Sequence, residues 1–169
     1  MVLYECESLE RLPESLGNLS NLRYMVLYEC ESLERLPESV GDLMKLQHMD
    51  LSGCKCLERL PESLGSLMNL QQMDLLECTS LEILLSMKAL VSLKELKASY
   101  CSKLKSIHDL GHLTRLEFLY VSGCLELEEL NGVEHCMSLQ LIYAQGCMNL
   151  KWSRGVVKKL RQRKVKAYF

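Results

Sequence analysis

The ten residues CESLERLPES occur twice in this chain, at Cys6–Ser15 and at Cys30–Ser39, and the nearly identical CKCLERLPES occupies Cys54–Ser63. A constant interval of 24 residues separates the three copies. A phrase repeated at such an interval is typical of a fold in which equivalent units stack along one axis. An enzyme active site, by contrast, is assembled from residues that occur once. The repeat therefore constrains the fold more than any other feature of the sequence.

Cysteine marks the same place in seven successive units, and the intervals are 24, 24, 24, 23, 23 and 23 residues. These residues are Cys6, Cys30, Cys54, Cys78, Cys101, Cys124 and Cys147. Stacked units would hold their side chains side by side and parallel, which is poor geometry for a disulfide. A buried free cysteine behaves as a small hydrophobe and a weak hydrogen-bond donor. We therefore predict an inward-pointing ladder of reduced thiols, which favours an intracellular protein.

The shared frame is LxxLxLxxCxxL, followed by a looser LPxxLG segment. Apolar residues alternate in the first half, which is typical of a short strand, whereas proline and glycine in the second half end any long helix and allow the chain to turn back. This frame resembles the leucine-rich repeat. The resemblance implies an α/β fold, a right-handed solenoid or horseshoe with a parallel concave sheet of about seven strands. The expected strands are residues 1–3, 24–28, 48–52, 72–76, 95–99, 118–122 and 141–145.

The pattern divides the chain into repeats over residues 1–150 and a basic cap or tail over residues 151–169. The first residues, Met1-Val2-Leu3, align with the interior of a strand, so we expect the repeats to come from a longer protein or a truncated gene. The segment Leu81–Leu93 lacks the proline and glycine of the other return segments, and we predict that it is more helical.

The phrases LSGCKCLERLPESLGSLMNLQQMDL and FLYVSGCLELEEL resemble the repeats of plant intracellular disease-resistance receptors of the Toll/interleukin-receptor, nucleotide-binding class. The resemblance implies a recognition and autoinhibitory module in a defence response. Its partner would be a pathogen effector, a guarded host protein or the receptor's own upstream domains. The receptor's nucleotide site does not carry over, because the chain has no GxxxxGK[ST] motif. The run LPESLGxLxxLxxL also resembles plant intracellular Ras-group repeat proteins, so a stand-alone scaffold or a receptor remnant is the alternative.

Strand residues that alternate with the buried ones should point away from the core and form the binding surface. We expect a protein ligand on this concave face, because exposed aromatic side chains commonly anchor interfaces. The expected surface residues are Tyr24, Val26, Tyr28, His48, Asp50, Ser52, Gln72, Asp74, Glu95, Lys97, Phe118, Tyr120, Ser122, Leu141, Tyr143 and Gln145. Within this set, Phe118, Tyr120 and Tyr143 should form one aromatic patch. The other interpretation of these aromatic residues is that they simply pack well in strands.

Charge is uneven along the chain. Residues 151–169 carry eight Lys or Arg and no acid, whereas residues 1–150 carry 12 basic and 22 acidic side chains. In the tail, Val156, Val157 and Leu160 could form an apolar stripe that covers the open end of the core. Nuclear import, anionic lipid and nucleic acid are competing interpretations of such a basic run, and we do not expect nucleic acid to be the partner.

Catalytic and metal motifs are weak. The sequence has no nucleophile elbow or HExxH motif, so we do not predict an enzyme, a cofactor or a small-molecule substrate. The pair Cys54 and Cys56 and the pair His108 and His112 have metal-ligand spacings, but a zinc site needs four converging ligands. No apolar run is long enough to span a membrane, and we expect a cytoplasmic location, with the nucleus as an alternative.

Overall fold

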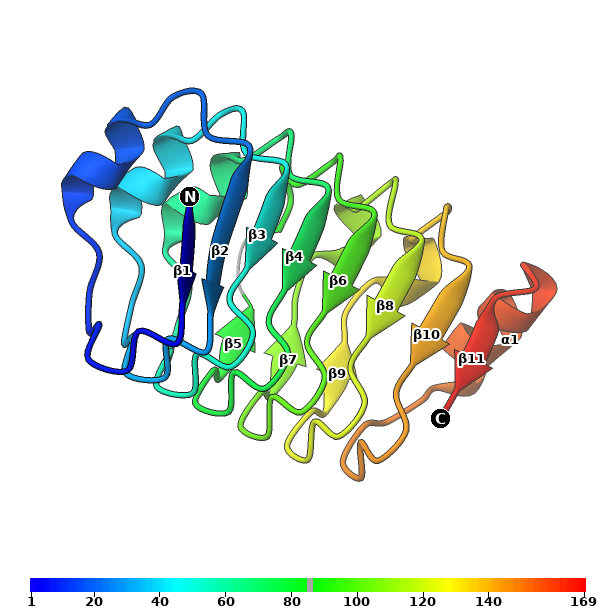
Figure 1. The fold of residues 1–169 in the computed structure, drawn as a ribbon. Coiled ribbons are helices and arrows are strands. Elements are labelled where there is room, and N and C mark those ends of the chain that lie inside the picture. The colour runs from blue at the N-terminus through cyan, green and yellow to red at the C-terminus, as the bar shows by residue number, and fades with distance from the viewer. Residues whose placement is uncertain (85–86) are drawn as a thin grey trace.

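The computed structural model describes residues 1–84 and 87–169 as a solenoid in which successive repeats lie side by side (Figure 1). Eight parallel strands form the main sheet in the order β1-β2-β3-β4-β6-β8-β10-β11. Their bounds are β1 Val2–Tyr4, β2 Tyr24–Tyr28, β3 His48–Asp50, β4 Gln72–Asp74, β6 Glu95–Lys97, β8 Phe118–Tyr120, β10 Leu141–Tyr143 and β11 Lys166–Tyr168. The predicted solenoid with a parallel sheet is confirmed, with one strand more than expected.

Pairing between repeats joins equivalent residues, as the spacing of 24 or 23 residues requires. Met25 pairs with Met49, and Met49 pairs with Met73. Most strands are shorter than predicted, because the regular part ends two residues earlier. Backbone hydrogen bonds still continue past it: the Leu51 N–H donates to the Asp74 carbonyl at 2.8 Å. The chain then leaves the sheet at Gly53, whose φ is +75°.

The return segments are short 3-10 helices instead of α-helices. Their bounds are η1 Glu14–Asn18, η2 Glu38–Asp42, η3 Glu62–Ser66, η4 Leu110–His112 and η5 Val133–His135. Proline precedes each of the first three, in the extended conformation that a helix N-cap requires, with φ between −74° and −65°. Neighbouring helices pack closely: a Cβ on Gly41 would lie 2.6 Å from the Ser63 carbonyl oxygen. Glycine at this position therefore permits adjacent repeats to touch.

A second, three-stranded parallel sheet lies on the other side of the core, in the order β5 (Ile83–Leu84), β7 (Ser106–Ile107) and β9 (Glu129–Leu130). The prediction of more helix over Leu81–Leu93 is wrong for the described part of that segment, which contains β5 and turns. Residues 85–86 of that segment lie outside the described residues. The physical reason is packing, because Leu84 is buried in register with Ile107 and the neighbouring repeat imposes an extended path.

The core is a continuous column of apolar side chains, mainly leucine, with the ladder cysteine of each repeat and, in addition, the buried Cys136. Cys54, Cys78 and Cys101 are fully buried, and their thiols donate to backbone carbonyls of the preceding repeat at 3.2, 3.2 and 3.1 Å. All nine cysteines are free thiols. The repeated cysteine therefore joins each repeat to the one before it and forms no disulfide.

The basic tail forms a helix and a strand at the C-terminal end (Figure 1). Helix α1 spans Arg154–Gln162 and begins at Ser153, whose hydroxyl accepts a hydrogen bond from the Val156 N–H at 3.2 Å. Leu160 is buried against the core, and Val156 packs beside it. After α1 the chain returns and β11 extends the main sheet, which the sequence analysis did not predict.

No helix in residues 1–84 and 87–169 has both the length and the apolar character needed to cross a membrane.

Candidate functional site

The outer face of the main sheet is the concave face of the solenoid, and its middle row crosses all eight strands. Its members occupy the same outward-facing register position in each strand. In strand order its members are Val2, Val26, Asp50, Asp74, Lys97, Tyr120, Tyr143 and Tyr168. Two aliphatic, two acidic, one basic and three aromatic side chains thus follow one another, each one strand apart.

The acidic centre of the row is held in place by local hydrogen bonds. One carboxylate oxygen of Asp50 accepts hydrogen bonds from the backbone N–H and the hydroxyl of Ser52, at 2.9 and 2.5 Å. Asp74 accepts a hydrogen bond from the Leu76 N–H at 3.0 Å and pairs with the Lys97 ammonium at 3.2 Å. These contacts fix both carboxylates at the surface of the sheet and leave each half-buried.

Lys97 is shared among several carboxylates. Partial burial acts to lower the pKa of Lys97, but the hydrogen bond to Asp74 and the negative charges of Asp74, Glu95 and Asp50 outweigh it and raise the pKa. Lys97 is therefore charged at neutral pH. Three carboxylates and one ammonium leave this part of the face net negative.

Three tyrosines stack at the C-terminal end of the row. The ring centroids of Tyr120 and Tyr143 are 5.6 Å apart, and those of Tyr143 and Tyr168 are 4.6 Å apart, with interplanar angles of 10° and 8°. Since the ring faces cover one another, the stack is partly self-packed and holds the three side chains in place. Phe118 and Leu141 are half-buried on the same two strands as Tyr120 and Tyr143.

A second aromatic group lies at the N-terminal end. Tyr24 stacks on His48 with the ring centroids 4.6 Å apart, and His48 shares a hydrogen bond of 2.7 Å with Gln72. Tyr4 and Tyr28 meet edge to face at 6.1 Å. The hydrogen bond to Glu29 and its negative charge raise the pKa of Tyr28. The acidic centre is consequently flanked by aromatic rings on both sides.

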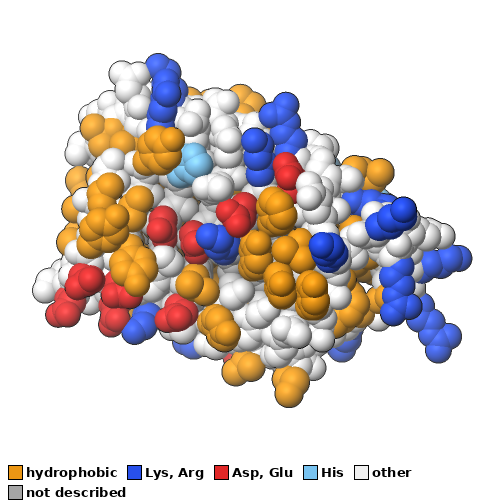
Figure 2. Space-filling view, turned by 45° about the vertical axis from the view of Figure 1, so that its right-hand side comes forward, with side chains coloured by type: hydrophobic (Ala, Val, Ile, Leu, Met, Phe, Trp, Pro, Cys, Tyr) orange, Lys and Arg blue, Asp and Glu red, His pale blue; other side chains and the backbone are white. Residues whose placement is uncertain are grey.

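A space-filling view shows the same order on one face of the molecule, where acidic and basic side chains lie between two groups of hydrophobic side chains (Figure 2). The face is hollowed at its centre by a depression of about 220 Å³. Strands β2, β3, β4 and β6 line it with Tyr24, Met25, Val26, His48, Met49, Asp50, Gln72, Met73, Asp74, Glu95 and Lys97.

The structure places most predicted surface residues on this face, half-buried or exposed. Ser52 is the exception, because it is only 5% exposed and its hydroxyl is bonded to Asp50. The expectation that Ser52 is an accessible residue is therefore wrong, and it acts by positioning Asp50. The sequence analysis also missed Lys166 and Tyr168. Their signal is the segment Lys166-Ala-Tyr168, which aligns with Leu141-Ile-Tyr143 of the preceding strand.

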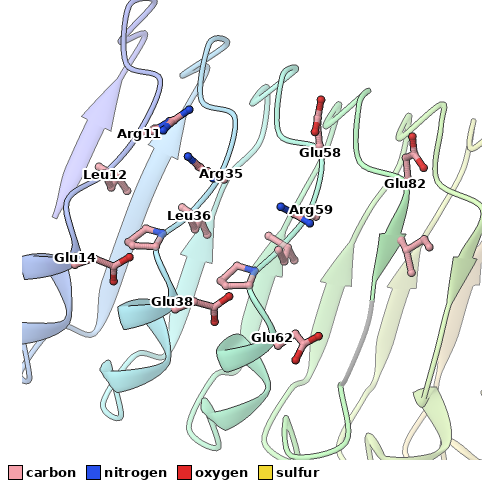
Figure 3. Close-up of a pocket in the computed structure, with 14 residues that line it drawn as sticks. Arg11, Leu12, Glu14, Arg35, Leu36, Glu38, Glu58, Arg59, Glu62 and Glu82 are labelled. Carbon is pink, nitrogen blue, oxygen red and sulfur yellow. The ribbon is translucent and has the colours of Figure 1, made fainter.

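A larger hollow, of about 970 Å³, lies elsewhere, between the first three 3-10 helices and the row of parallel bridges that joins Arg11, Arg35, Arg59 and Ile83. Figure 3 shows Arg11, Arg35 and Arg59 in one row and Glu14, Glu38 and Glu62 in another. Many of these charged side chains form contacts between neighbouring repeats. Arg11 pairs with Glu34 at 3.3 Å, and the carboxylates of Glu14 and Glu38 accept hydrogen bonds from the backbone N–H of Ser39 and Ser63 at 3.1 and 3.2 Å. We call this hollow the convex groove.

The two candidate metal pairs do not converge. Cys54 is buried whereas Cys56 is exposed, and His108 bonds the Ser106 hydroxyl and the Asn131 amide at 3.0 and 3.2 Å. Among the described residues no three His, Cys, Asp or Glu side chains are grouped closely enough to hold a metal ion.

Comparison with known proteins gives a family and a fold. A model of the leucine-rich repeat region matches residues 1–161, and it describes a repeat region and not a catalytic domain. No curated protein matches. The leucine-rich repeat domain of the type III effector XopL is 17% identical, with a TM-score of 0.56 over 98% of this chain and 74% of that domain.

Other similar structures are larger. The Arabidopsis receptor kinase HAESA, solved with the peptide hormone IDA and the co-receptor SERK1, is 19% identical, with a TM-score of 0.53 over 83% of this chain and 26% of its own. A leucine-rich repeat protein of Leptospira interrogans is 18% identical, with a TM-score of 0.49, and this chain spans 52% of its length. The match of the repeat model to nearly the whole chain shows that this protein belongs to the leucine-rich repeat family.

Proposed function

We propose that this chain is a protein-interaction module that binds a protein ligand on its concave face. The observation that carries the proposal is the composition of that face, where exposed or half-buried aromatic rings lie on both sides of an acidic centre. Tyr24 is 54% exposed and Tyr168 is 42% exposed. Amphipathic aromatic side chains of this kind commonly supply most of the binding energy at interfaces.

We further propose that the module serves a plant-type intracellular immune receptor as its recognition and autoinhibitory part. The cysteine-bearing LSGCxxLxxLP phrases support this proposal. The ligand would then be a pathogen effector, a guarded host protein or an upstream domain of the same receptor. A cytoplasmic location is part of the proposal and is supported by nine free cysteines, which a reducing compartment preserves. Residues 1–150 would supply most of the recognition surface, and residues 151–169 would cap the end of the core and add Tyr168 to that surface.

The proposal can be tested by comparing two variants with equal numbers of changes on opposite faces. The concave variant carries Tyr24→Ser and Leu141→Ser, and the groove variant carries Arg59→Ser and Ile83→Ser. Each immobilised protein is incubated with an extract of the source cells, and retained proteins are quantified against the unchanged chain. We expect the concave variant to retain its specific partner at least about tenfold less, because losing two anchors costs more than 1.4 kcal/mol.

The groove variant serves as the control and should retain the partner at the level of the unchanged chain. Thermal unfolding of both variants is measured in parallel, so that a loss of folding is not mistaken for a loss of binding. Loss of the partner in the groove variant, with normal capture by the folded concave variant, would contradict the proposal.

A further inference from the structure

We infer that the ligand of the concave face is an extended peptide segment, lying across the strands, with a lysine or arginine over the acidic centre and a large apolar side chain four residues away. This inference rests on the proposed function and adds the chemical class of the partner. It follows from the sign of the charge, the place of the aromatic rings and the distance between them.

The acidic centre selects a cation. Asp50, Asp74 and Glu95 supply three negative charges to one face, and Lys97 supplies one positive charge, which already lies 3.2 Å from Asp74. Within the described part of the chain, no lysine or arginine nitrogen lies within 4.0 Å of the Asp50 carboxylate. The hydrogen bonds from Ser52 hold only one oxygen of Asp50, so the other can accept from a ligand. An arriving ammonium or guanidinium would form charge-assisted hydrogen bonds there.

Further acidic residues at the edge of the face act in the same direction. Glu5, Glu29 and Glu77 occupy one repeat position, where the chain leaves the sheet with φ between 51° and 59°. The hydrogen bond that Tyr28 donates to Glu29 raises the pKa of Tyr28 most, and the negative charges of Glu29, Glu5 and Glu77 raise it further. The N-terminal half of the face would therefore repel phosphate groups, which argues against a nucleic acid partner.

The tyrosine stack supplies the apolar subsite. Because Tyr120, Tyr143 and Tyr168 cover one another's ring faces, they turn ring edges and hydroxyls toward the ligand. Phe118 and Leu141 lie half-buried beside them and provide aliphatic and aromatic surface. A ligand side chain of the size of leucine or phenylalanine can bury its apolar surface against these residues, which a short polar side chain would not do.

The distance between the two subsites fits an extended chain. Asp50 on β3 and Tyr120 on β8 are separated by three strand steps, through β4 and β6. At about 4.8 Å a step the separation is about 14 Å. An extended peptide rises about 3.3 Å per residue and directs alternate side chains to one side, so residues i and i+4 face the sheet about 13 Å apart. A basic residue over Asp50 thus places the side chain four positions away over Tyr120, the first ring of the tyrosine stack.

The test is a selection from a phage library of random peptides on the immobilised full chain. We expect the enriched peptides to carry lysine or arginine with leucine, methionine or an aromatic residue four positions away. The peptide enriched most strongly is then synthesised with a fluorescent label and its Kd is measured. We expect D50N with D74N to weaken it at least about tenfold, since charge-assisted hydrogen bonds are lost. Asparagine retains the oxygen that accepts from Ser52 or Leu76, so these backbone contacts are preserved, and D74N additionally removes the ion pair with Lys97.

A matched control removes two carboxylates from the convex groove, through E58Q and E62Q, and should leave the Kd of the peptide unchanged. Leu141→Ser tests the apolar subsite and should also weaken binding. Enriched peptides with acidic or uncharged centres, an unchanged Kd with D50N and D74N, or no enrichment at all would overturn the inference. If Leu141→Ser weakens the peptide while D50N and D74N do not, only the basic preference fails. If instead E58Q and E62Q weaken it, the proposed concave site itself fails.

Discussion

At the scale of single residues, the cysteine of each repeat explains how stacked units are held in register. The Leu51 carbonyl accepts two hydrogen bonds, one from the Cys54 N–H at 3.1 Å and one from the Cys78 thiol at 3.2 Å. The Leu75 carbonyl is bonded in the same way by the Cys78 N–H and the Cys101 thiol. Each thiol thus satisfies the second lone pair of a buried carbonyl in the neighbouring repeat, which explains why a small buried donor recurs at this place.

Replacement of one ladder cysteine should destabilise the protein. We expect Cys78→Ala to lower the free energy of unfolding by about 1–3 kcal/mol, because a buried hydrogen bond and its packing are lost. The measurement is urea denaturation followed by circular dichroism. Cys56→Ala is the control, since Cys56 is exposed, and it should change the free energy by less than about 0.5 kcal/mol. Equal effects of the two substitutions on the free energy of unfolding would show that the cysteine ladder contributes nothing to stability.

The thiols also make stability depend on pH. Burial raises the pKa of Cys54 and Cys101 to about 12 from an ordinary value of 9.0. The unfolded chain loses these protons first, so their contribution is fully present below about pH 9 and is lost as the pH rises toward about 12. We expect the free energy of unfolding to fall less steeply in Cys101→Ala than in the unchanged chain over this range. If the free energy of unfolding fell equally steeply with pH in both proteins, this prediction would be contradicted.

At the scale of elements, the sequence predicts the parts that repeat and fails where a repeat is modified. The register of the main sheet and the thiol ladder could be predicted, because both depend on spacing alone. The 3-10 helices and the sheet formed by β5, β7 and β9 could not, since the return segments lack strong periodicity and neighbouring repeats decide their path. Strand β11 was missed because three residues, Lys166–Tyr168, form a strand only when β10 is beside them.

The candidate site could likewise be predicted from the sequence only in part. Residues on either side of a buried strand residue were predicted to face outward, and alternation was sufficient for that. The burial of Ser52 was not predictable from alternation, because it depends on a hydrogen bond to Asp50 and on the turn at Gly53. Likewise, the stacking of Tyr143 between Tyr120 and Tyr168 requires knowledge of β11.

Leu160 should supply much of the stability that the C-terminal elements contribute. Leu160 of α1 is 1% exposed, and Arg163 beyond the helix donates hydrogen bonds to the carbonyls of Glu134 and Cys136. We expect Leu160→Ala to reduce the free energy of unfolding of this end by about 2–5 kcal/mol. Hydrogen exchange should show faster exchange in β10 and β11 and little change in β2 and β3, since repeats interact mainly with their neighbours.

Lys159→Ala provides the control for this substitution, because Lys159 is exposed on the same helix. It should alter the free energy of unfolding by less than about 0.5 kcal/mol. Unchanged exchange in β10 and β11 after Leu160→Ala would show that α1 does not cover the end of the core.

At the scale of the whole molecule, charge and shape separate three surfaces. The concave face is acidic at its centre and aromatic at both ends, the convex groove has much of its charge committed between repeats, and α1 carries a basic surface at one end. We assign binding to the first of these surfaces. The concave side chains are ordered by contacts within the face, yet they keep accessible ring edges and carboxylate oxygens. In the convex groove, by contrast, Glu14 and Glu38 hold the next repeat in place.

The most direct test of this assignment is site-specific photo-crosslinking. A benzophenone amino acid is placed at Tyr143 on the concave face in one protein and at Glu62 in the convex groove in another. Each full chain is irradiated with the labelled peptide recovered from the phage selection, and adducts are quantified by mass spectrometry. We expect adducts from position 143 and only background from position 62. Adducts from position 62 with background at position 143 would contradict it.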